Sequence, residues 1–185
     1  MRDENREAVQ AGSFEQVVLP HLDAAYNLAR WLVRKPQDAE DIVQEAYLRA
    51  FKFFGGYRGG DARSWVLKIV RNTSYSFLER DRTDTLAEEF DETVHTAVSE
   101  QSGVEGALLQ SVDSEMLREA LDELPVNFRE VIVLRELEDM SYREIAEVMG
   151  KPMGTVMSGL ARARTQLKER LIRMRAEEGR RGLRE

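Results

Sequence analysis

Apolar residues recur at every third or fourth position through most of this chain, which is the spacing of helices with one buried face. In the N-terminal half, this pattern predicts helices over residues 13–34, 36–54 and 61–80. We expect Pro20 to bend or divide the first helix, whereas Pro36 suits the first turn of the second. Because the three helices share one apolar seam, the sequence predicts a small helical domain here.

The C-terminal half has the same period. It predicts helices over residues 113–124 and 126–138, separated by Pro125, and then a pair of helices within residues 141–175. The alternation of apolar and polar residues that is typical of strands is missing from the chain. We therefore expect an all-α fold.

The pair of helices within residues 141–175 has the local signals of a helix-turn-helix. Ser141 and Glu144 have the spacing of a capping box, which satisfies two amides at a helix start. Gly150 suits the left-handed residue that ends this helix, and Thr155 is the expected N-cap of the next one. Proteins commonly use this arrangement to place the second helix in the major groove of DNA.

Charge supports this interpretation. Residues 151–175 carry seven basic residues and one acidic residue, a local charge of +6, in a chain of net charge −7. The apolar positions of this helix leave a second, outward set of residues: Met157, Ser158, Ala161, Arg162 and Thr165. A helical hairpin with merely solvated charges is the alternative, and it requires the cap, the turn and the basic face to coincide by accident. We favour nucleic-acid binding.

Residues 84–105 have a different composition, with seven acidic residues and no Lys or Arg. Their few apolar residues are irregularly spaced, which is typical of a flexible acidic linker that DNA would repel. A solvated tether without a role of its own remains an alternative. The sequence thus predicts two small helical domains, residues 10–83 and 112–175, joined by a linker over residues 84–111.

Composition argues against several kinds of function. The 185 residues include no cysteine and only two histidines, in unrelated settings, so we expect no metal site, cofactor or catalytic centre. No apolar run approaches the ~18 residues of a membrane span, and the N-terminus is polar, so we expect a cytoplasmic protein.

Three blocks of the sequence resemble one family. They are DAEDIVQEAYLRAF (residues 38–51), SWVLKIVRN (64–72) and LPVNFREVIVLRELEDMSYREIAEVMGKPMGTVMSGLARAR (124–164). In this order, they are similar to the extracytoplasmic-function (ECF) group of bacterial RNA polymerase sigma factors. The resemblance covers about residues 14–171.

The resemblance implies that the first domain is sigma region 2. In such proteins this region binds the β′ coiled coil of core RNA polymerase, melts the −10 promoter element and captures a flipped base. The positions that match the polymerase-docking helix are Asp38, Glu40, Asp41, Gln44 and Glu45. The positions that match the −10-reading segment are Tyr57, Arg58, Arg63, Lys68, Arg71 and Asn72. Cations and aromatic rings together suit single-stranded DNA, because an unpaired base exposes its π-face.

The resemblance also implies that the second domain is sigma region 4, which binds the −35 element and the β flap of the polymerase. Its matching DNA-binding positions are Thr155, Met157, Ser158, Ala161, Arg162 and Arg164. Gly159 and Met157 depart from the family, which commonly has cations at both positions, so Arg162 is expected to carry an unusual share of the DNA contact. The family further implies an anti-sigma factor, often membrane-anchored, that occludes both domains.

Two other classes of protein were considered. A response regulator has a similar C-terminal domain, but it needs a receiver domain with strands, which the helical N-terminal half does not predict. An adaptor that binds only an anti-sigma factor should have lost basic residues at positions such as Arg58, Lys68 and Arg162, and all of these are present.

Overall fold

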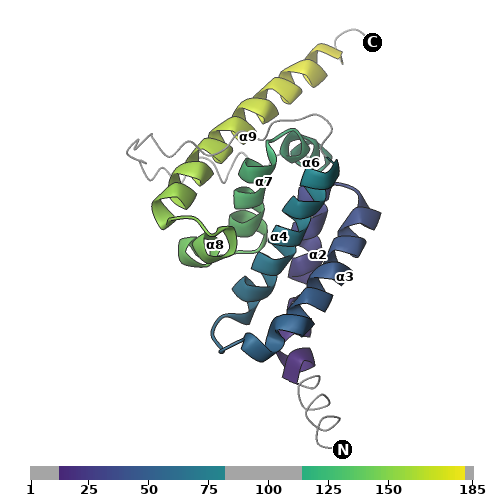
Figure 1. The fold of residues 1–185 in the computed structure, drawn as a ribbon. Helices are drawn as coiled ribbons and strands as arrows, with labels where there is room; N and C mark the ends of the chain where they lie inside the picture. Colours follow the sequence, from purple (N-terminus) through teal and green to yellow (C-terminus); the bar gives the residue numbers. More distant parts are fainter. Residues whose placement is uncertain (1–12, 82–113, 182–185) are drawn as a thin grey trace, which may run out of the picture.

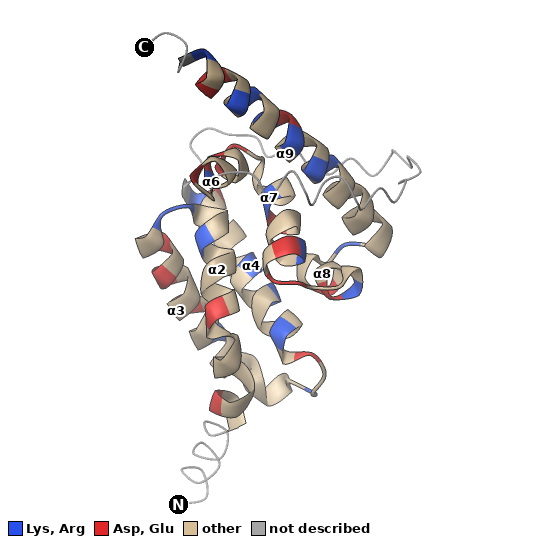
Figure 2. Cartoon of the chain, turned by 180° about the vertical axis from the view of Figure 1, so that it is seen from behind, with Lys and Arg blue, Asp and Glu red and all other residues tan. Residues whose placement is uncertain are grey.

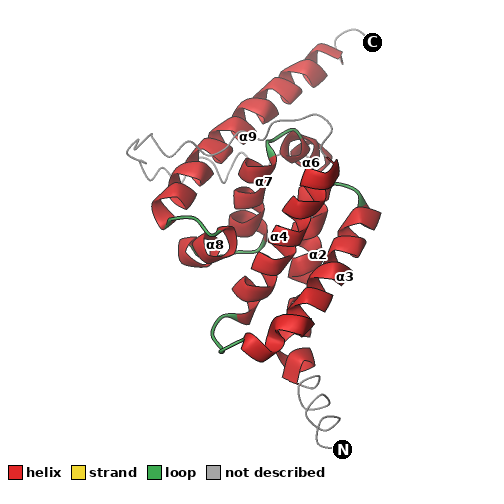
Figure 3. Cartoon of the chain, viewed as in Figure 1, coloured by secondary structure: helices red, strands yellow, loops and turns green. Residues whose placement is uncertain are grey.

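The computed structural model describes residues 13–81 and 114–181, and every regular element in these two stretches is helical (Figures 1 and 3). The all-α fold is therefore confirmed. The acidic linker expected over residues 84–111 lies outside the described residues.

The N-terminal domain is a bundle of three long helices. Residues 13–18 are helical and lead into a 3₁₀ turn, η1 (Leu19–His21), and then α2 (Leu22–Val33). Pro20 thus divides the first predicted helix, as expected. The bundle is completed by α3 (Pro36–Phe53), a second 3₁₀ turn, η2 (Phe54–Gly56), and α4 (Ala62–Asp81). Its buried centre includes Leu28, Leu32, Ile42 and Leu67.

The C-terminal domain contains five helical segments: α6 (Ser114–Asp122), α7 (Val126–Ile132), a π-helical turn η3 (Val133–Leu137), α8 (Tyr142–Met149) and α9 (Met153–Arg181). The helix predicted over residues 126–138 is therefore α7 continued by a wider turn. The Glu138 amide donates to the Val133 carbonyl at 3.0 Å, five residues back. Such π-turns are often found at functional sites.

Both local signals at α8 are confirmed. The Ser141 amide donates to the Glu144 carboxylate at 2.7 Å, and the Glu144 amide donates to the Ser141 hydroxyl at 3.3 Å. Gly150 has φ of 63° and ends the helix in the left-handed region. The N-cap predicted at Thr155 is wrong, because α9 already begins at Met153 and the Thr155 amide donates to the Pro152 carbonyl at 3.0 Å.

The two domains pack directly against each other. α4 packs against α8 and α2 packs against α7, and buried apolar residues of both domains belong to one continuous core (Figures 1 and 2). The sequence pattern predicted two separate units because periodicity reports which face of a helix is buried, not which partner buries it. This packing decides how accessible the candidate site residues are.

Candidate nucleic-acid and polymerase interfaces

The DNA-facing candidate of the C-terminal domain is the first half of α9. Its predicted apolar stripe is buried, namely Val156, Leu160, Ala163, Leu167 and Leu171. The opposite side holds the outward residues predicted from the sequence: Met157 and Thr165 are exposed, and Thr155, Ser158, Ala161 and Arg162 are half-buried. The helix therefore presents a mixed apolar, hydroxyl and cationic surface in its first three turns.

The two arginines of this surface differ in their surroundings. None of the residues described in 13–81 and 114–181 forms a hydrogen bond or ion pair with the Arg162 guanidinium. Arg164 instead lies on the flank of α9, where its guanidinium donates to Glu136 of η3 at 2.5 and 3.1 Å. Of the two, Arg162 is thus the one without a competing carboxylate in the described structure.

Gly159 is buried, on the side of α9 that carries Val156 and Ala163. A residue three positions after Val156 lies on the packed flank of the helix, so Gly159 is not among the outward residues.

The polymerase-docking candidates lie on the outer side of α3, where Figure 2 shows acidic patches. Glu40, Asp41 and Gln44 are exposed, whereas Asp38 and Glu45 are half-buried. The Glu45 carboxylate accepts from Arg49, one turn further along the helix. The sequence analysis missed Leu48, which follows Gln44 by four residues and is 72% exposed. It extends the acidic and amide surface with one large apolar side chain.

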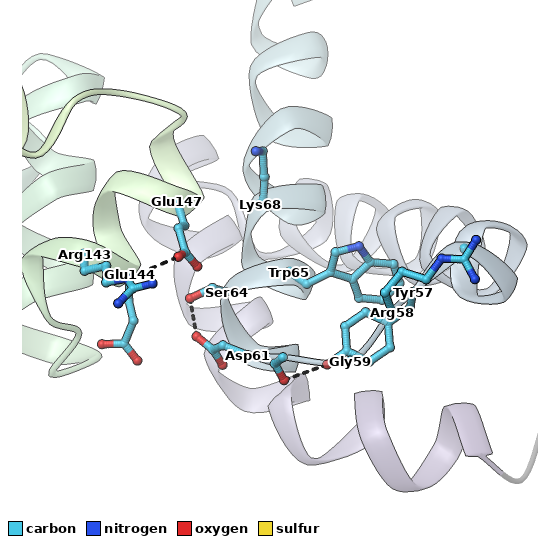
Figure 4. Close-up of a pocket in the computed structure, with 12 residues that line it drawn as sticks. Tyr57, Arg58, Gly59, Asp61, Ser64, Trp65, Lys68, Arg143, Glu144 and Glu147 are labelled. Atoms are coloured by element: carbon cyan, nitrogen blue, oxygen red, sulfur yellow. Dashed lines mark hydrogen bonds and ion pairs between the residues drawn. The ribbon is translucent and has the colours of Figure 1, made fainter.

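The −10-reading candidates divide into two groups, and the first lines a cavity of about 660 Å³ beside the loop that precedes α4 (Figure 4). Tyr57, Arg58 and Lys68 lie on this wall with Trp65, whose ring centroid is 5.0 Å from that of Tyr57. The Tyr57 hydroxyl donates to the Gly60 carbonyl at 2.8 Å, which fixes the ring against the loop. Two half-buried aromatic rings beside two cations suit an unpaired base and its phosphate.

The loop itself is shaped by glycine and by Asp61. Gly59 and Gly60 have φ of 86° and 101°, values that side-chain-bearing residues rarely adopt. Asp61 then accepts from the Arg63 amide at 3.0 Å and from the Ser64 hydroxyl, so it caps α4.

The opposite wall of the cavity belongs to the other domain. Arg143, Glu144 and Glu147 of α8 face the aromatic wall, and Figure 4 shows Arg143 directed toward Glu147 at an N–O distance of 3.8 Å. The helix that starts the helix-turn-helix therefore stands beside the side chains expected to read the −10 element.

The second group, Arg63 and Arg71, is turned away from this cavity and is engaged by carboxylates of the C-terminal domain. Arg63 donates to Glu138 at 2.6 Å, and Arg71 donates to Glu130 of α7 at 2.6 Å. Asn72, the remaining candidate, is exposed. The structure thus does not bring all six predicted residues together.

Glu130 is the most deeply buried of the charged side chains in the described residues, with 0% exposure. Besides Arg71, it accepts from the Tyr75 hydroxyl at 2.7 Å, and the Arg71 guanidinium lies 4.4 Å above the Tyr75 ring centroid. Burial raises the pKa of the Glu130 carboxyl above its ordinary value, although Arg71 and Tyr75 oppose the shift. Sequence reasoning missed Glu130 because a glutamate in a short helix is normally read as solvated; its position between Phe128 and Val131 was the available signal.

The described residues contain no group of three or more side chains that could hold a metal ion. None of their helices combines the length and the apolar character needed to cross a bilayer.

Comparison with known proteins identifies both domains. Residues 17–83 match the family described as sigma-70 region 2, and residues 114–167 match sigma-70 region 4. The chain is 33% identical to the ECF RNA polymerase sigma factor SigE of Mycolicibacterium smegmatis over 168 residues, which are 89% of this chain and 64% of that protein. It is 34% identical to RNA polymerase sigma-H factor of Pseudomonas aeruginosa over 176 residues, 89% of this chain and 91% of that protein.

Solved structures agree with these relatives. The chain is similar to the sigma factor RpoE of Bartonella quintana, solved in complex with the anti-sigma factor NepR, with a TM-score of 0.65 and 30% identity over 86% of this chain and 96% of that one. It is also similar to CnrH in complex with the cytosolic domain of CnrY, with a TM-score of 0.60 and 25% identity over 88% and 92% of the two chains. From its two matched regions and its relatives, this chain belongs to the ECF group of RNA polymerase sigma factors.

Proposed function

We propose that this sigma factor binds core RNA polymerase and the two ends of a promoter through separate surfaces on its two domains. The observation that carries the proposal is the helix-turn-helix itself. A capped α8, a left-handed Gly150 and the exposed N-terminal turns of α9 form a surface that fits the major groove. The domain limits remain those expected from the sequence, residues 10–83 for region 2 and 112–175 for region 4.

Region 4 would read the −35 element through the outward side of α9 and would bind the β flap of the polymerase. Arg162 is the principal candidate, since no described carboxylate competes for its guanidinium. Arg164 would first have to leave Glu136, and both partners of that pair are partly exposed, so the exchange costs little. Thr155, Met157, Ser158 and Ala161 would supply shorter-range contacts.

Region 2 would dock on the β′ coiled coil through the outer side of α3. The carboxylates and amide of Asp41, Gln44 and Glu45 suit a partner rich in Arg and Lys, because charge-assisted hydrogen bonds fix the register of such an interface. The neighbouring Leu48 would add an apolar contact at its edge.

The −10 element would be read as a single strand by the wall of Tyr57, Arg58 and Lys68, with Asn72 and the arginines of α4 holding phosphates or base edges. Trp65, in contact with Tyr57, would support this wall rather than act alone.

An anti-sigma factor is the expected regulator, because the similar sigma factor RpoE was solved with the anti-sigma factor NepR bound. A protein of this type would act by covering the docking and DNA-binding surfaces. The family resemblance implies that such a regulator is often membrane-anchored.

Transcription in vitro tests the proposal. Purified chain and core polymerase are incubated with pooled genomic fragments, and run-off products are sequenced. We expect products from a limited set of promoters that require the added chain. If the chain neither co-elutes with core polymerase nor yields any run-off product, the proposed function is wrong.

A further inference from the structure

Among the described residues, two ion pairs connect the domains, and both use arginines that the proposed function assigns to promoter DNA. Arg71 and Arg63 lie eight residues apart on α4, and their partners Glu130 and Glu138 also lie eight residues apart. Eight residues of α-helix span about 12 Å. Arg63, the earlier arginine, pairs with Glu138, the later glutamate, and Arg71 pairs with Glu130. The two segments therefore run antiparallel, and the spacing of the carboxylates matches the spacing of the arginines.

The carboxylates are buried in this arrangement. Glu130 is 0% exposed and Glu138 is 7% exposed, whereas Arg71 and Arg63 are 17% and 30% exposed. Tyr75 and Asn27 of the N-terminal domain add hydrogen bonds to Glu130 and Glu138, at 2.7 and 3.4 Å respectively. A DNA phosphate would have to displace Glu130 from the Arg71 guanidinium.

We propose that Glu130 and Glu138 hold the chain in a closed form in which they take the place of promoter phosphates on Arg71 and Arg63. The inference rests on the proposed function and assigns it a regulation built into the chain. In the same closed form, α8 stands over the cavity of Tyr57 and Lys68. Opening would free both arginines and uncover this wall in one movement.

The opposing free-energy terms of these ion pairs suit a reversible contact between the domains. The attraction within each pair is offset by the cost of removing both charges from water, so a buried ion pair adds little net stability to the closed form. A partner that separates the domains lets water and then DNA phosphates solvate the released arginines. The closed form therefore disfavours DNA before core polymerase is bound without preventing its opening.

Three single variants test this proposal. Glu130→Gln and Glu138→Gln keep the shape of each side chain and remove its charge. Glu119→Gln is the matched control, because it removes the same charge from the same domain, and its exposed side chain on α6 pairs with no cation among the described residues. If the Glu130→Gln variant fails to fold, Glu138→Gln still tests the proposal, since Glu138 is less deeply buried than Glu130.

Domain separation is measured by energy transfer between dyes on cysteines introduced at Lys52 and Glu169, both exposed and in different domains. The chain has no native cysteine to interfere. DNA binding is measured with a fluorescent single strand of mixed sequence. If the open form is about a tenth of the free chain, opening it fully tightens binding about tenfold.

We expect lower energy transfer and tighter single-strand binding for Glu130→Gln and Glu138→Gln, with Glu119→Gln matching the parent. Unchanged energy transfer and affinity in both test variants would overturn the proposal. An equal gain in affinity for Glu119→Gln would also overturn it, because net charge alone would then explain the effect. If energy transfer falls but no form binds DNA, with or without core polymerase, the proposed −10 function fails while the closure by Glu130 and Glu138 stands.

A separate observation concerns the specificity of α9. Met153 and Met157 are 53% and 37% exposed at the start of this helix, four residues apart, and Ala161 continues the same strip one turn later. A thioether side chain makes mainly apolar contacts. The one apolar group that base pairs present in the major groove is the 5-methyl group of thymine.

We infer that Met157 selects a thymine in the −35 element through this methyl group. The inference rests on the proposed binding of α9 to DNA and adds one base preference to it. A cation at this position would favour phosphate or guanine, so Met157 would change the sequence that is read rather than the overall attraction to DNA.

Replacing thymine with deoxyuridine removes the methyl group and nothing else. In a −35 duplex taken from a run-off promoter, each thymine is replaced in turn and titrated with the full chain. We expect one replacement to weaken binding about fourfold, the value of one buried methyl group. Met157→Ala should bind the parent duplex equally weakly and should lose this sensitivity, whereas Met174→Ala, far along the same helix, should keep it.

Sensitivity that persists in Met157→Ala, or no sensitive thymine at all, would overturn the inference while leaving −35 binding intact. An unchanged affinity of Met157→Ala for every duplex would also overturn it and would assign the exposed methionines to a protein partner. Failure of the chain to bind any −35 duplex, alone or with polymerase, would instead contradict the proposed function of α9.

Discussion

Replacing Gly150 with alanine should destabilise the C-terminal domain through the backbone alone. Gly150 has φ of 63° and ψ of 34°, and a Cβ built on it has no atom within 4 Å. There is no steric clash with neighbours, so the cost is that of the left-handed conformation, about 1–2 kcal/mol for a residue with a side chain. For a chain of this size, 1 kcal/mol lowers Tm by about 2–4 °C, so we expect a decrease of about 2–8 °C.

The assay is thermal and urea unfolding of the full chain, followed by circular dichroism. Because the substitution acts on the native turn, the urea midpoint should fall while the slope of the transition stays the same. Gly150→Asn should lose less than Gly150→Ala, since asparagine adopts the left-handed region more readily. This order is specific to the backbone conformation and would not follow from helix propensity.

Gly154→Ala is the matched control. It lies in the first turn of α9, it has no left-handed φ, and its Cβ also meets no atom within 4 Å. The same chemical change should there stabilise the chain by about 0.5–1 kcal/mol, because alanine loses less backbone entropy in a helix. Equal midpoints for Gly150→Ala and the parent, or a loss for both variants, would refute the reasoning.

Three further predictions follow from the site. Arg162→Ala should weaken binding to a −35 duplex by about 1–3 kcal/mol if the guanidinium reads a base, as measured by titration at two salt concentrations. Arg173→Ala should instead change the affinity for specific and scrambled duplexes equally. Identical behaviour of the two variants would show that Arg162 does not read a base. Leu48→Ala should raise the Kd for core polymerase in a competition assay without changing Tm, because its side chain is 72% exposed; an unaltered Kd would exclude it from the interface. Burial raises the pKa of Glu130 above its ordinary 4.5, so the folded chain binds a proton more readily than the unfolded one. The stability of the fold should therefore decrease as pH rises from about 5 through the raised pKa. Glu130→Gln should abolish this part of the pH profile of Tm, and a variant profile parallel to that of the parent would contradict the assignment.

The elements that the sequence predicted well are those with local causes. Pro20, Pro36 and Gly150 act through their own backbone angles, and the capping box of Ser141 and Glu144 closes within four residues. Their effects can be recognised without knowing the fold. The start of α9 was misplaced because the Pro152 carbonyl accepts the first helical hydrogen bonds, which side-chain preferences do not reveal.

The packing between the domains could not be predicted in the same way. Glu130 meets Arg71 across 59 residues of sequence, and Glu138 meets Arg63 across 75. The periodicity of α4 and α7 does not distinguish a cation that is free to bind DNA from one that is already paired with a carboxylate. The roles of the candidate site residues stay a prediction from the family resemblance, whereas their present partners depend on tertiary structure and could not be predicted.

The unbroken course of α9 has a mechanical consequence. This helix has 29 residues, which corresponds to a rod about 44 Å long, and in Figure 1 its C-terminal end extends past the rest of the protein. A small tilt of the far end would swing the outward side chains of the first turns relative to the DNA. A bulky fusion at the C-terminus would lie far from the promoter, yet by tilting α9 it would change the contacts of the first turns with the −35 element. Labels intended to be silent are better placed on α2.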